Sequence, residues 1–313
     1  MKSCCVLLPF FLTQVDAGVA PVVLKHDGWV AAVAFAPDGK TLASAGADNV
    51  VRLWEVGTWK PKGVLKGHTD CVTTIAFESQ SFLASGSFDG TVKRWSLSKG
   101  EAVKTYKISR SPILTVLAGE TGGFISGGGS GGVWKHPPSR IEWRHRSWVN
   151  SLAIVGDLNK WRGVASGSSD GTVLLWAPSE VGGRAKMDSL EGGAGEVRCV
   201  AFSPDGKLLA AGNRYHTVRI WDVATRKEVK TLTGHMSDVW SIAFSPDGKT
   251  LAAADTDWKK ASKVKLWDTT TWKDRGALDV PGEILSIAYS PKGDWLAVGS
   301  WDRTVRVFRI DGK

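Results

Sequence analysis

An internal repeat fills almost the whole of this chain. Seven near-copies share one pattern: a His, an apolar run, a tight turn, a second apolar run, an Asp and a closing aromatic residue. Six copies end plainly, at Trp54, Trp95, Trp176, Trp221, Trp267 and Phe308. The remaining copy is degenerate and aligns best with His136, rather than Trp134, in the closing position, which gives spacings of 41, 41, 40, 45, 46 and 41 residues. Repeats of this length built from short strands predict stacked sheet units rather than one packed enzyme core.

Each copy contains short apolar runs of strand length separated by turn-forming residues. Hydrophobicity alternates along segments 30–35 and 51–54 of the first copy. The turns at 36–40 and 203–207 have Pro early and Gly late. The whole pattern resembles the WD40 (WD-repeat) β-propeller family over residues 21–313, in a style similar to its bacterial members. The resemblance implies an all-β fold of seven four-stranded antiparallel blades around a central channel.

The ends of the repeat array predict how the ring closes. Residues 21–25 form an additional apolar run before the first His, whereas the last copy has no fourth run after Phe308. We expect the run at 21–25 to complete the last blade beside residues 304–310, which removes an exposed sheet edge. Residues 21–313 are therefore expected to form one propeller domain.

Residues 1–20 differ from the repeats. Lys2 precedes an apolar run at 4–12 that is too short to span a bilayer, and small residues follow at 15–17. The segment is either a secretory signal peptide, residues 1–17, or an irregular tail. The first alternative predicts an exported or periplasmic protein and the second a cytoplasmic one; neither predicts a membrane span. No intrachain disulfide is expected, since Cys71 and Cys199 occupy different positions in separate copies.

Composition indicates a globular protein without a dedicated nucleic-acid site. The chain is 42% hydrophobic and 23% charged, and its formal net charge of +9 is spread over several copies. Because no DNA- or RNA-reading motif accompanies this charge, we expect no specific nucleic-acid partner. We also expect no metal and no cofactor, since the repeated histidines belong to different copies and lack metal-binding spacings.

The family resemblance implies a hydrogen-bond network of Trp, Ser, His and Asp within a blade. Three copies carry the complete set: Trp54, Ser44, His26 and Asp48; Trp95, Ser85, His68 and Asp89; Trp176, Ser166, His145 and Asp170. The residue types resemble a catalytic triad, but threefold repetition favours structural bracing. In copies five to seven, Tyr215 and Ala261 fill the Asp position, Val280 the His position and Phe308 the Trp position. We expect those blades to depend more on apolar packing.

Three short motifs suggest enzymes but lack the required context. Residues 127–132 satisfy GxGxxG and residues 167–171 satisfy GxSxG, yet both motifs need a strand-to-helix turn where strands are expected here. Ser96 and Lys99 have the spacing of a Ser-Lys pair without its companion motifs. We therefore expect a protein that is not an enzyme.

The resemblance also implies which residues line the channel rim: two positions per copy at the start of the inner strand, and the position before the Asp. The first set is Trp29, Cys71, Pro112, Trp148, Glu196, Asp238 and Glu283; the second is Ala31, Thr73, Leu114, Asn150, Arg198, Trp240 and Leu285; the third includes Ala47, Phe88, Ser169 and Trp301. Aromatic and Arg side chains of this kind are typical of interface hot spots. The candidate binding residues are Trp29, Phe88, Trp148, Glu196, Arg198, Asp238, Trp240, Glu283 and Trp301. Alternatively, some of these rings pack on one another over the channel mouth.

These patterns predict a non-catalytic, monomeric scaffold that binds a protein or peptide on the channel-rim face. The acidic rim residues of copies five to seven favour a partner with a basic residue. Two alternatives remain open: an exported propeller that binds glycans or other ligands through its tryptophans, and an accessory domain of an enzyme complex.

Overall fold

The computed structural model describes residues 20–119, 122–136, 140–156, 163–177, 186–191, 195–256 and 261–310, and it leaves the side chains of 140–142, 177, 186 and 191 undescribed. The two alternatives for the N-terminal segment therefore concern residues outside the described part, apart from residue 20. All described regular structure is β-strand, and no helix that could cross a membrane is found among the described residues.

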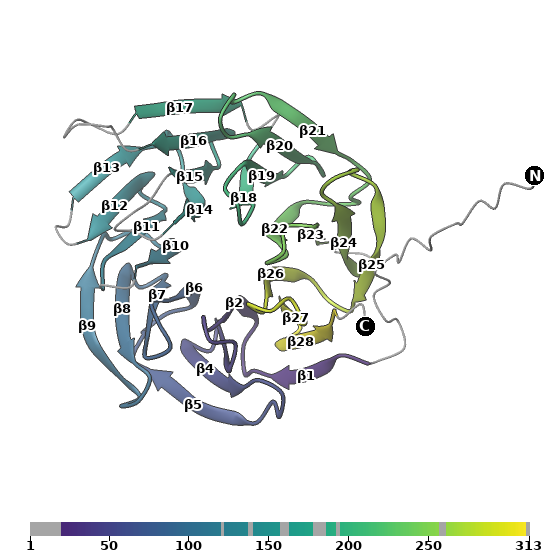
Figure 1. Ribbon diagram of the computed structural model, residues 1–313. Helices are drawn as coiled ribbons and strands as arrows, with labels where there is room; N and C mark the ends of the chain where they lie inside the picture. Colours follow the sequence, from purple (N-terminus) through teal and green to yellow (C-terminus); the bar gives the residue numbers. More distant parts are fainter. Residues whose placement is uncertain are drawn as a thin grey trace, which may run out of the picture.

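Seven four-stranded antiparallel sheets are arranged as a ring, which confirms the predicted seven-bladed β-propeller (Figure 1). Blade 1 contains β2 (Val30–Phe35), β3 (Thr41–Gly46), β4 (Val50–Glu55) and β5 (Pro61–Lys66); blade 2 contains β6 (Val72–Phe77), β7 (Phe82–Ser87), β8 (Thr91–Ser96) and β9 (Glu101–Lys107); blade 3 contains β10 (Ile113–Ala118), β11 (Phe124–Gly128), β12 (Gly132–His136) and β13 (Arg140–Arg144); blade 4 contains β14 (Val149–Val155), β15 (Gly163–Ser168), β16 (Thr172–Ala177) and β17 (Lys186–Glu191).

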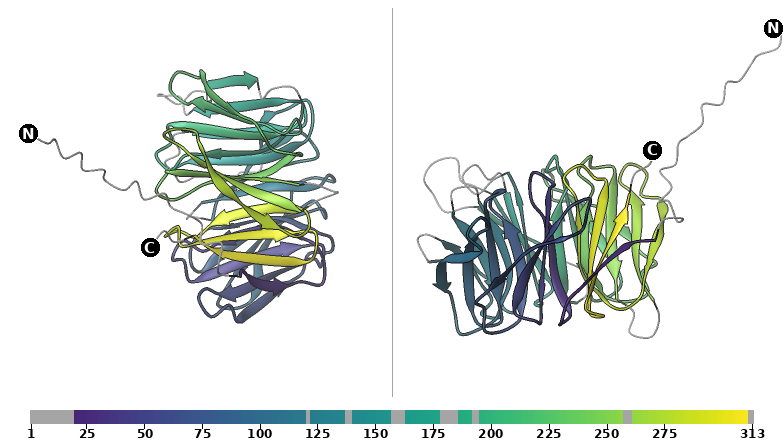
Figure 2. Two further views of the ribbon diagram at one scale, coloured as in Figure 1. Left: turned by 90° about the vertical axis from the view of Figure 1, so that its right-hand side faces the viewer. Right: turned by 90° about the horizontal axis from the view of Figure 1, so that it is seen from below.

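The other three blades follow the same order from the centre of the ring outwards. Blade 5 contains β18 (Val197–Phe202), β19 (Leu208–Asn213), β20 (Val218–Asp222) and β21 (Glu228–Leu232); blade 6 contains β22 (Val239–Phe244), β23 (Thr250–Asp255), β24 (Ser262–Asp268) and β25 (Asp274–Val280); blade 7 contains β26 (Ile284–Tyr289), β27 (Trp295–Ser300), β28 (Thr304–Arg309) and β1 (Val22–Lys25). Seen from the side, the ring is a disc whose strands run between two faces (Figure 2).

The N-terminal strand closes the ring as predicted. β1 pairs antiparallel with β28, with Leu24 opposite Val305 and Val22 opposite Val307. The backbone N–H of His26 then donates to the carbonyl of Arg303 at 2.8 Å. This pairing supplies the outer strand of blade 7 from the other end of the chain and leaves β28 without an open edge.

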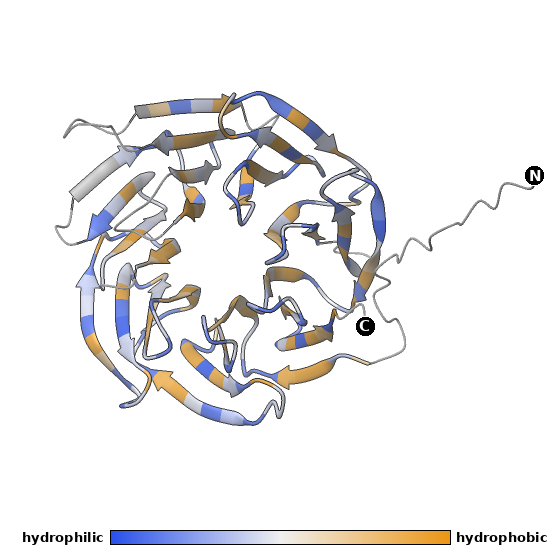
Figure 3. Cartoon of the chain, viewed as in Figure 1, coloured by the Kyte–Doolittle hydropathy of each residue, from blue (hydrophilic) through white to orange (hydrophobic). Residues whose placement is uncertain are grey.

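Apolar packing between neighbouring blades forms the core. Each of seven buried clusters combines residues of two adjacent blades; one contains Val92 of blade 2 and Phe124 of blade 3. The inner strands are mostly hydrophobic, while outer strands such as β9 and β25 carry many hydrophilic residues (Figure 3). In every blade a nearly inaccessible second-strand residue lies opposite the closing position: Leu42, Leu83, Phe124, Val164, Leu209, Leu251 and Leu296. Phe124 pairs with His136, so His136 does fill the closing position of the degenerate copy.

Hydroxyl groups join neighbouring inner strands at five of the blade junctions. At the ring closure, the backbone N–H of Val33 donates to Oγ of Ser286 at 3.2 Å, and Ile287 N–H donates to Oγ of Ser241 at 3.0 Å. Equivalent bonds come from Thr74, Thr115 and Ser151. They satisfy inner-strand donors that face the next blade and fix the blades relative to one another.

Candidate functional site: the rim of the propeller

One backbone hydrogen bond recurs in all seven blades and defines the candidate site. The residue that follows the second strand donates its N–H to the carbonyl of the first rim position: Ala47 to Trp29, Phe88 to Cys71, Gly129 to Pro112, Ser169 to Trp148, Arg214 to Glu196, Thr256 to Asp238 and Trp301 to Glu283, at 2.9 to 3.2 Å. These bonds bring the first and third predicted sets together. We call the face of the disc that carries these loops the rim face.

The second predicted set occupies a β-bulge in every blade. The pairing register of the inner strand shifts on either side of one residue, and that residue is Ala31, Thr73, Leu114, Asn150, Arg198, Trp240 or Leu285. A bulge re-aims the side chain at the end of a strand. Two of these side chains bond to the backbone of the next blade: Thr73 Oγ1 donates to the carbonyl of Ile113, and Asn150 Nδ2 donates to the carbonyl of Val197 at 2.8 Å.

Two predicted tryptophans stack on one another where blades 7 and 1 meet. The rings of Trp29 and Trp301 are parallel to within 8°, with centroids 4.9 Å apart. Trp301 is nevertheless 48% exposed, so the pair presents an indole to solvent. Its backbone is bonded to Glu283, whose Oε2 is buried without a hydrogen-bond partner. Burial raises the pKa of the Glu283 carboxyl. We call Trp29, Trp301 and Glu283 the acidic corner.

A second group of rim residues also combines an aromatic ring with carboxylates, but it includes an arginine. The guanidinium of Arg198 lies over the Trp240 ring at 4.6 Å from the centroid. It pairs with Glu196 at 2.8 Å and with Asp238 at 3.5 Å, and Glu196 also pairs with Arg214 at 3.1 Å. Two of the three acidic side chains that were expected to attract a partner's cation are thus paired within the chain. Glu283 has no such partner among the described residues.

Exposed large hydrophobic residues fall into two groups. One consists of single aliphatic side chains on outer strands: Val23, Val64, Val103, Met187 and Val229. The other lies on the rim-face loops and includes all four exposed aromatic residues of the described chain: Phe88 at 38%, Trp148 at 49%, Trp301 at 48% and Tyr215 at 62%, together with Met236. Sequence reasoning missed Tyr215 and Met236 as surface candidates, although both lie in loops adjoining predicted rim positions.

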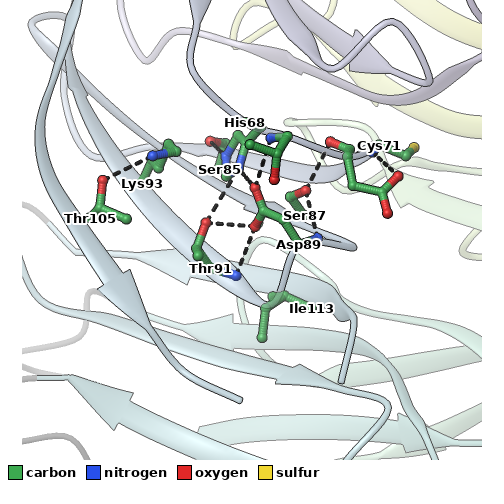
Figure 4. Close-up of polar contacts among 12 residues, drawn as sticks. His68, Cys71, Ser85, Ser87, Asp89, Thr91, Lys93, Thr105 and Ile113 are labelled. Carbon is green, nitrogen blue, oxygen red and sulfur yellow. Dashed lines mark hydrogen bonds and ion pairs between the residues drawn. The ribbon is translucent and has the colours of Figure 1, made fainter. Parts of the chain in front are cut away.

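The expected polar network forms completely in blades 1, 2 and 4. In blade 2, Trp95 Nε1 donates to Ser85 Oγ at 2.7 Å. Ser85 Oγ contacts His68 Nε2 at 2.8 Å, and His68 Nδ1 contacts Asp89 at 2.7 Å (Figure 4). The same contacts join Trp54, Ser44, His26 and Asp48, and Trp176, Ser166, His145 and Asp170. Every serine in the network is fully buried. A one-way chain of donors from Trp to Asp leaves each shared atom satisfied, which suits bracing.

The protonation states agree with this donor chain. Burial lowers the pKa of His68 and His145 despite the neighbouring carboxylates, so each ring is neutral at pH 7 and its Nε2 can accept from serine. Burial alone would raise the pKa of Asp89, but hydrogen bonds from Thr91 and His68 outweigh it and leave that pKa below its usual value. The carboxylate is therefore ionised and accepts from Nδ1.

Blades 6 and 7 differ from one another, and the expectation for blade 6 was wrong in part. Although Ala261 fills the aligned Asp position, His235 Nδ1 contacts the carboxylate of Asp255 at 3.2 Å, because the end of β23 brings this side chain to the same ring. Ala253 replaces the serine, and both His235 Nε2 and Trp267 Nε1 are buried without partners. In the seventh copy, Val280 at the end of β25 and Phe308 of β28 are buried apolar residues, as expected.

The enzyme-like motifs occur between strands. The glycines at 127–132 end β11 and begin β12, and residues 167–171 end β15 and lead into β16. Cys71 and Cys199 are free thiols, and burial raises the pKa of each to about 12. Among the described residues, no group of three or more His, Cys, Asp or Glu side chains is placed to hold a metal ion.

Comparison with known proteins agrees with the fold. A family model described as "WD domain, G-beta repeat" matches residues 21–55, 59–96, 139–177, 185–222, 226–268 and 276–309. The interval between the second and third matches contains β9 to β12, so the degenerate copy forms a blade although the model does not match it.

Curated proteins with similar sequences are much longer than this chain. Apoptotic protease-activating factor 1 of Rattus norvegicus is 29% identical over 64% of this chain and 13% of its own length. Telomerase protein component 1 of the same species is 26% identical over 89% of this chain and 10% of its own length. WD40 repeat-containing protein HOS15 of Arabidopsis thaliana is 28% identical over 87% of this chain and 48% of its own length. The chain therefore spans less than half of each of these relatives.

Proposed function

Because this chain belongs to the WD40 repeat family, we propose that it is a non-catalytic scaffold that binds a protein or peptide partner on its rim face. The observation that carries this proposal is the position of the exposed aromatic residues. All four in the described chain lie on the rim face, whereas the outer strands expose only scattered aliphatic side chains. Aromatic side chains gathered on one face are the composition of an interface core, where a single anchor contributes about 2 kcal/mol or more.

The acidic corner favours a partner that carries a positive charge. Arg198 on Trp240, held by Glu196 and Asp238, shows how this rim accommodates a guanidinium: one aromatic face and one or two carboxylates. The acidic corner has the aromatic pair and Glu283 but no resident cation among the described residues. A Lys or Arg of the partner placed there would gain a cation–π contact and an ion pair.

A matched pair of triple variants tests the proposal. Phe88→Ala, Trp148→Ala and Trp301→Ala together remove three exposed rim aromatics, while Val64→Ala, Val103→Ala and Val229→Ala remove three exposed side chains from outer strands. Partners captured by the wild-type protein from its native host are identified by mass spectrometry and then titrated as pure proteins. We expect the rim variant to lose binding and the outer-strand variant to retain it.

Thermal unfolding of both variants first establishes that the ring is intact. Undiminished binding by the rim variant, or equal loss in both variants, would contradict the proposal. A glycan array probed with the wild-type protein and the rim variant addresses the alternative ligand class, since exposed indoles also stack on sugars. Glycan binding lost in the rim variant, without any protein partner, would replace the scaffold by a glycan-binding protein.

A further inference from the structure

A basic depression lies where blades 3 and 4 meet on the rim face. It has a volume of about 700 Å³, and its lining includes Ser130 from the turn between β11 and β12, and Arg144, Arg146, Ser147 and Trp148 from the end of β13 and the loop before β14. Trp148 at its border is 49% exposed.

Neither guanidinium group in the depression has an acidic partner among the described residues. Arg144 and Arg146 are exposed, and the one side-chain bond of either is from Arg144 Nη1 to the carbonyl of Ser130 at 3.3 Å, within the described chain. The nearby carboxylate of Asp170 accepts from the ring of His145 and from the backbone N–H of Arg146. It therefore supports the loop and leaves the two side-chain cations unneutralised.

Most other arginines with described contacts are paired, which sets these two apart. Arg52, Arg94, Arg198 and Arg306 each contact a carboxylate, and on this face Arg198 and Arg214 share Glu196. Arg110, exposed in the loop before β10 of the adjoining blade, adds a third positive charge to this side of the rim. Within the described chain, the rim face thus carries the unpaired cations of Arg144 and Arg146 over blades 3 and 4, and a carboxyl without an ion-pair partner, Glu283, in blade 7.

We propose that the depression at Arg144, Arg146 and Trp148 binds an anionic side chain, a carboxylate or a phosphoryl group, of an acidic peptide segment. The two guanidinium groups would donate charge-assisted hydrogen bonds to the anion, and the Ser130 and Ser147 hydroxyls offer further donors. The Trp148 indole would cover an apolar neighbour of the anionic residue. This inference depends on the proposed function only in taking a polypeptide as the ligand.

A peptide fits the charge distribution better than a nucleic acid. A nucleic-acid site needs cations that follow successive phosphates, together with bases stacked on several aromatic rings. Here Arg110, Arg144 and Arg146 lie on one side of the ring, while Glu283 would repel a polyanion that continued across it. A peptide can present an acidic residue to blades 3 and 4 and a basic residue to the acidic corner.

Fluorescence anisotropy with labelled peptides tests the depression without the native partner. The probes are an oligoglutamate peptide that contains one leucine, its phosphoserine counterpart and its glutamine counterpart. Arg144→Ala with Arg146→Ala is compared with Lys227→Ala with Lys230→Ala, a control that removes two exposed positive charges near β21. We expect the anionic peptides, but not the glutamine peptide, to bind the wild-type protein and the lysine control. The arginine variant should bind about tenfold more weakly or worse, the loss of one or two exposed charge-assisted contacts.

Several results would overturn the inference. Equal weakening in the two double variants would show a general effect of net charge, and unchanged binding by the arginine variant would place the anion elsewhere. Competition by oligothymidylate at lower concentration than the peptides would assign the depression to nucleic acid. Absence of anionic peptide binding, while native partners still require the rim aromatics, would refute this site and leave the proposed scaffold function intact. Preference for the phosphoserine or the glutamate peptide identifies which anion the site favours.

Discussion

Blade 6 lacks the serine hydroxyl of the polar network, and restoring this hydroxyl should stabilise the protein. Ala253 is completely buried and lies opposite Ile242, the register in which Ser44 lies opposite Val33 and Ser85 opposite Ile75. In blades 1 and 2 the serine hydroxyl connects the closing Trp to the His. In blade 6 the two atoms that it would connect, Trp267 Nε1 and His235 Nε2, have no partner. We predict that Ala253→Ser stabilises the protein.

The size of the effect follows from the atoms involved. An unsatisfied buried donor or acceptor costs about 1–3 kcal/mol, and a net hydrogen bond contributes about 1 kcal/mol. The serine would satisfy one donor and one acceptor at once, but it must lose its own hydration. We therefore expect the free energy of unfolding to rise by about 1–2 kcal/mol. In a protein of this size, that corresponds to a few degrees in the melting temperature.

Urea unfolding followed by tryptophan fluorescence measures the change, as a higher midpoint at unchanged slope. Ala252→Ser is the matched control: Ala252 is equally buried and next in sequence, but packs in the apolar cluster between blades 6 and 7. The control should be less stable than wild type, because it buries a hydroxyl without an orphaned partner. If Ala253→Ser were no more stable than the wild-type protein, or as unstable as the control, the explanation of the Trp, Ser, His and Asp network would be wrong.

Three further predictions concern the ring as a whole. Burial lowers the pKa of His136 to about 4, so stability that is present above pH 6.5 should be lost as the pH falls towards 4, by about 3 kcal/mol. In urea unfolding across this range, the stability of His136→Phe should depend less steeply on pH than that of the wild-type protein. An equal pH dependence would contradict the lowered pKa of His136. Leu24→Ala should destabilise by about 2–5 kcal/mol because Leu24, in the closing strand β1, is buried in the apolar cluster between blades 7 and 1. Thermal unfolding of Val23→Ala, on the exposed side of β1, should match wild type, and equal melting of the two variants would contradict the closure. Cys71 and Cys199 should react with a thiol reagent at pH 8 only after unfolding, and rapid reaction of the native protein would refute their burial.

The sequence was sufficient for the fold because each copy repeats the same local pattern. Alignment of the Gly-rich stretch of the degenerate copy placed His136 in the closing position, where the structure has it opposite Phe124. The run at 21–25 was likewise assigned correctly to the last blade. These predictions depend on periodicity and on strand-sized apolar runs, which a linear sequence records directly.

The contacts on the rim could not be predicted in the same way, since they join side chains from different loops and blades. Position-by-position alignment assigned Ala261 to the place of an Asp, but Asp255 reaches His235 from the end of β23. It also grouped Glu196 and Asp238 as free acidic residues, whereas Arg198 bonds to both. Which of several nearby charges pair depends on side-chain geometry, and a repeat pattern does not specify it.

The proposal that partners bind the rim face can be tested by site-specific photo-cross-linking. A photoreactive phenylalanine analogue is introduced in place of Trp148 or Trp301 on the rim, and in place of Val64 or Val103 on the outer strands. Each variant is irradiated with a purified partner, and the products are separated by mass. We predict covalent adducts from both rim positions and none from the outer strands. Adducts from Val64 or Val103, with none from Trp148 or Trp301, would contradict the claim.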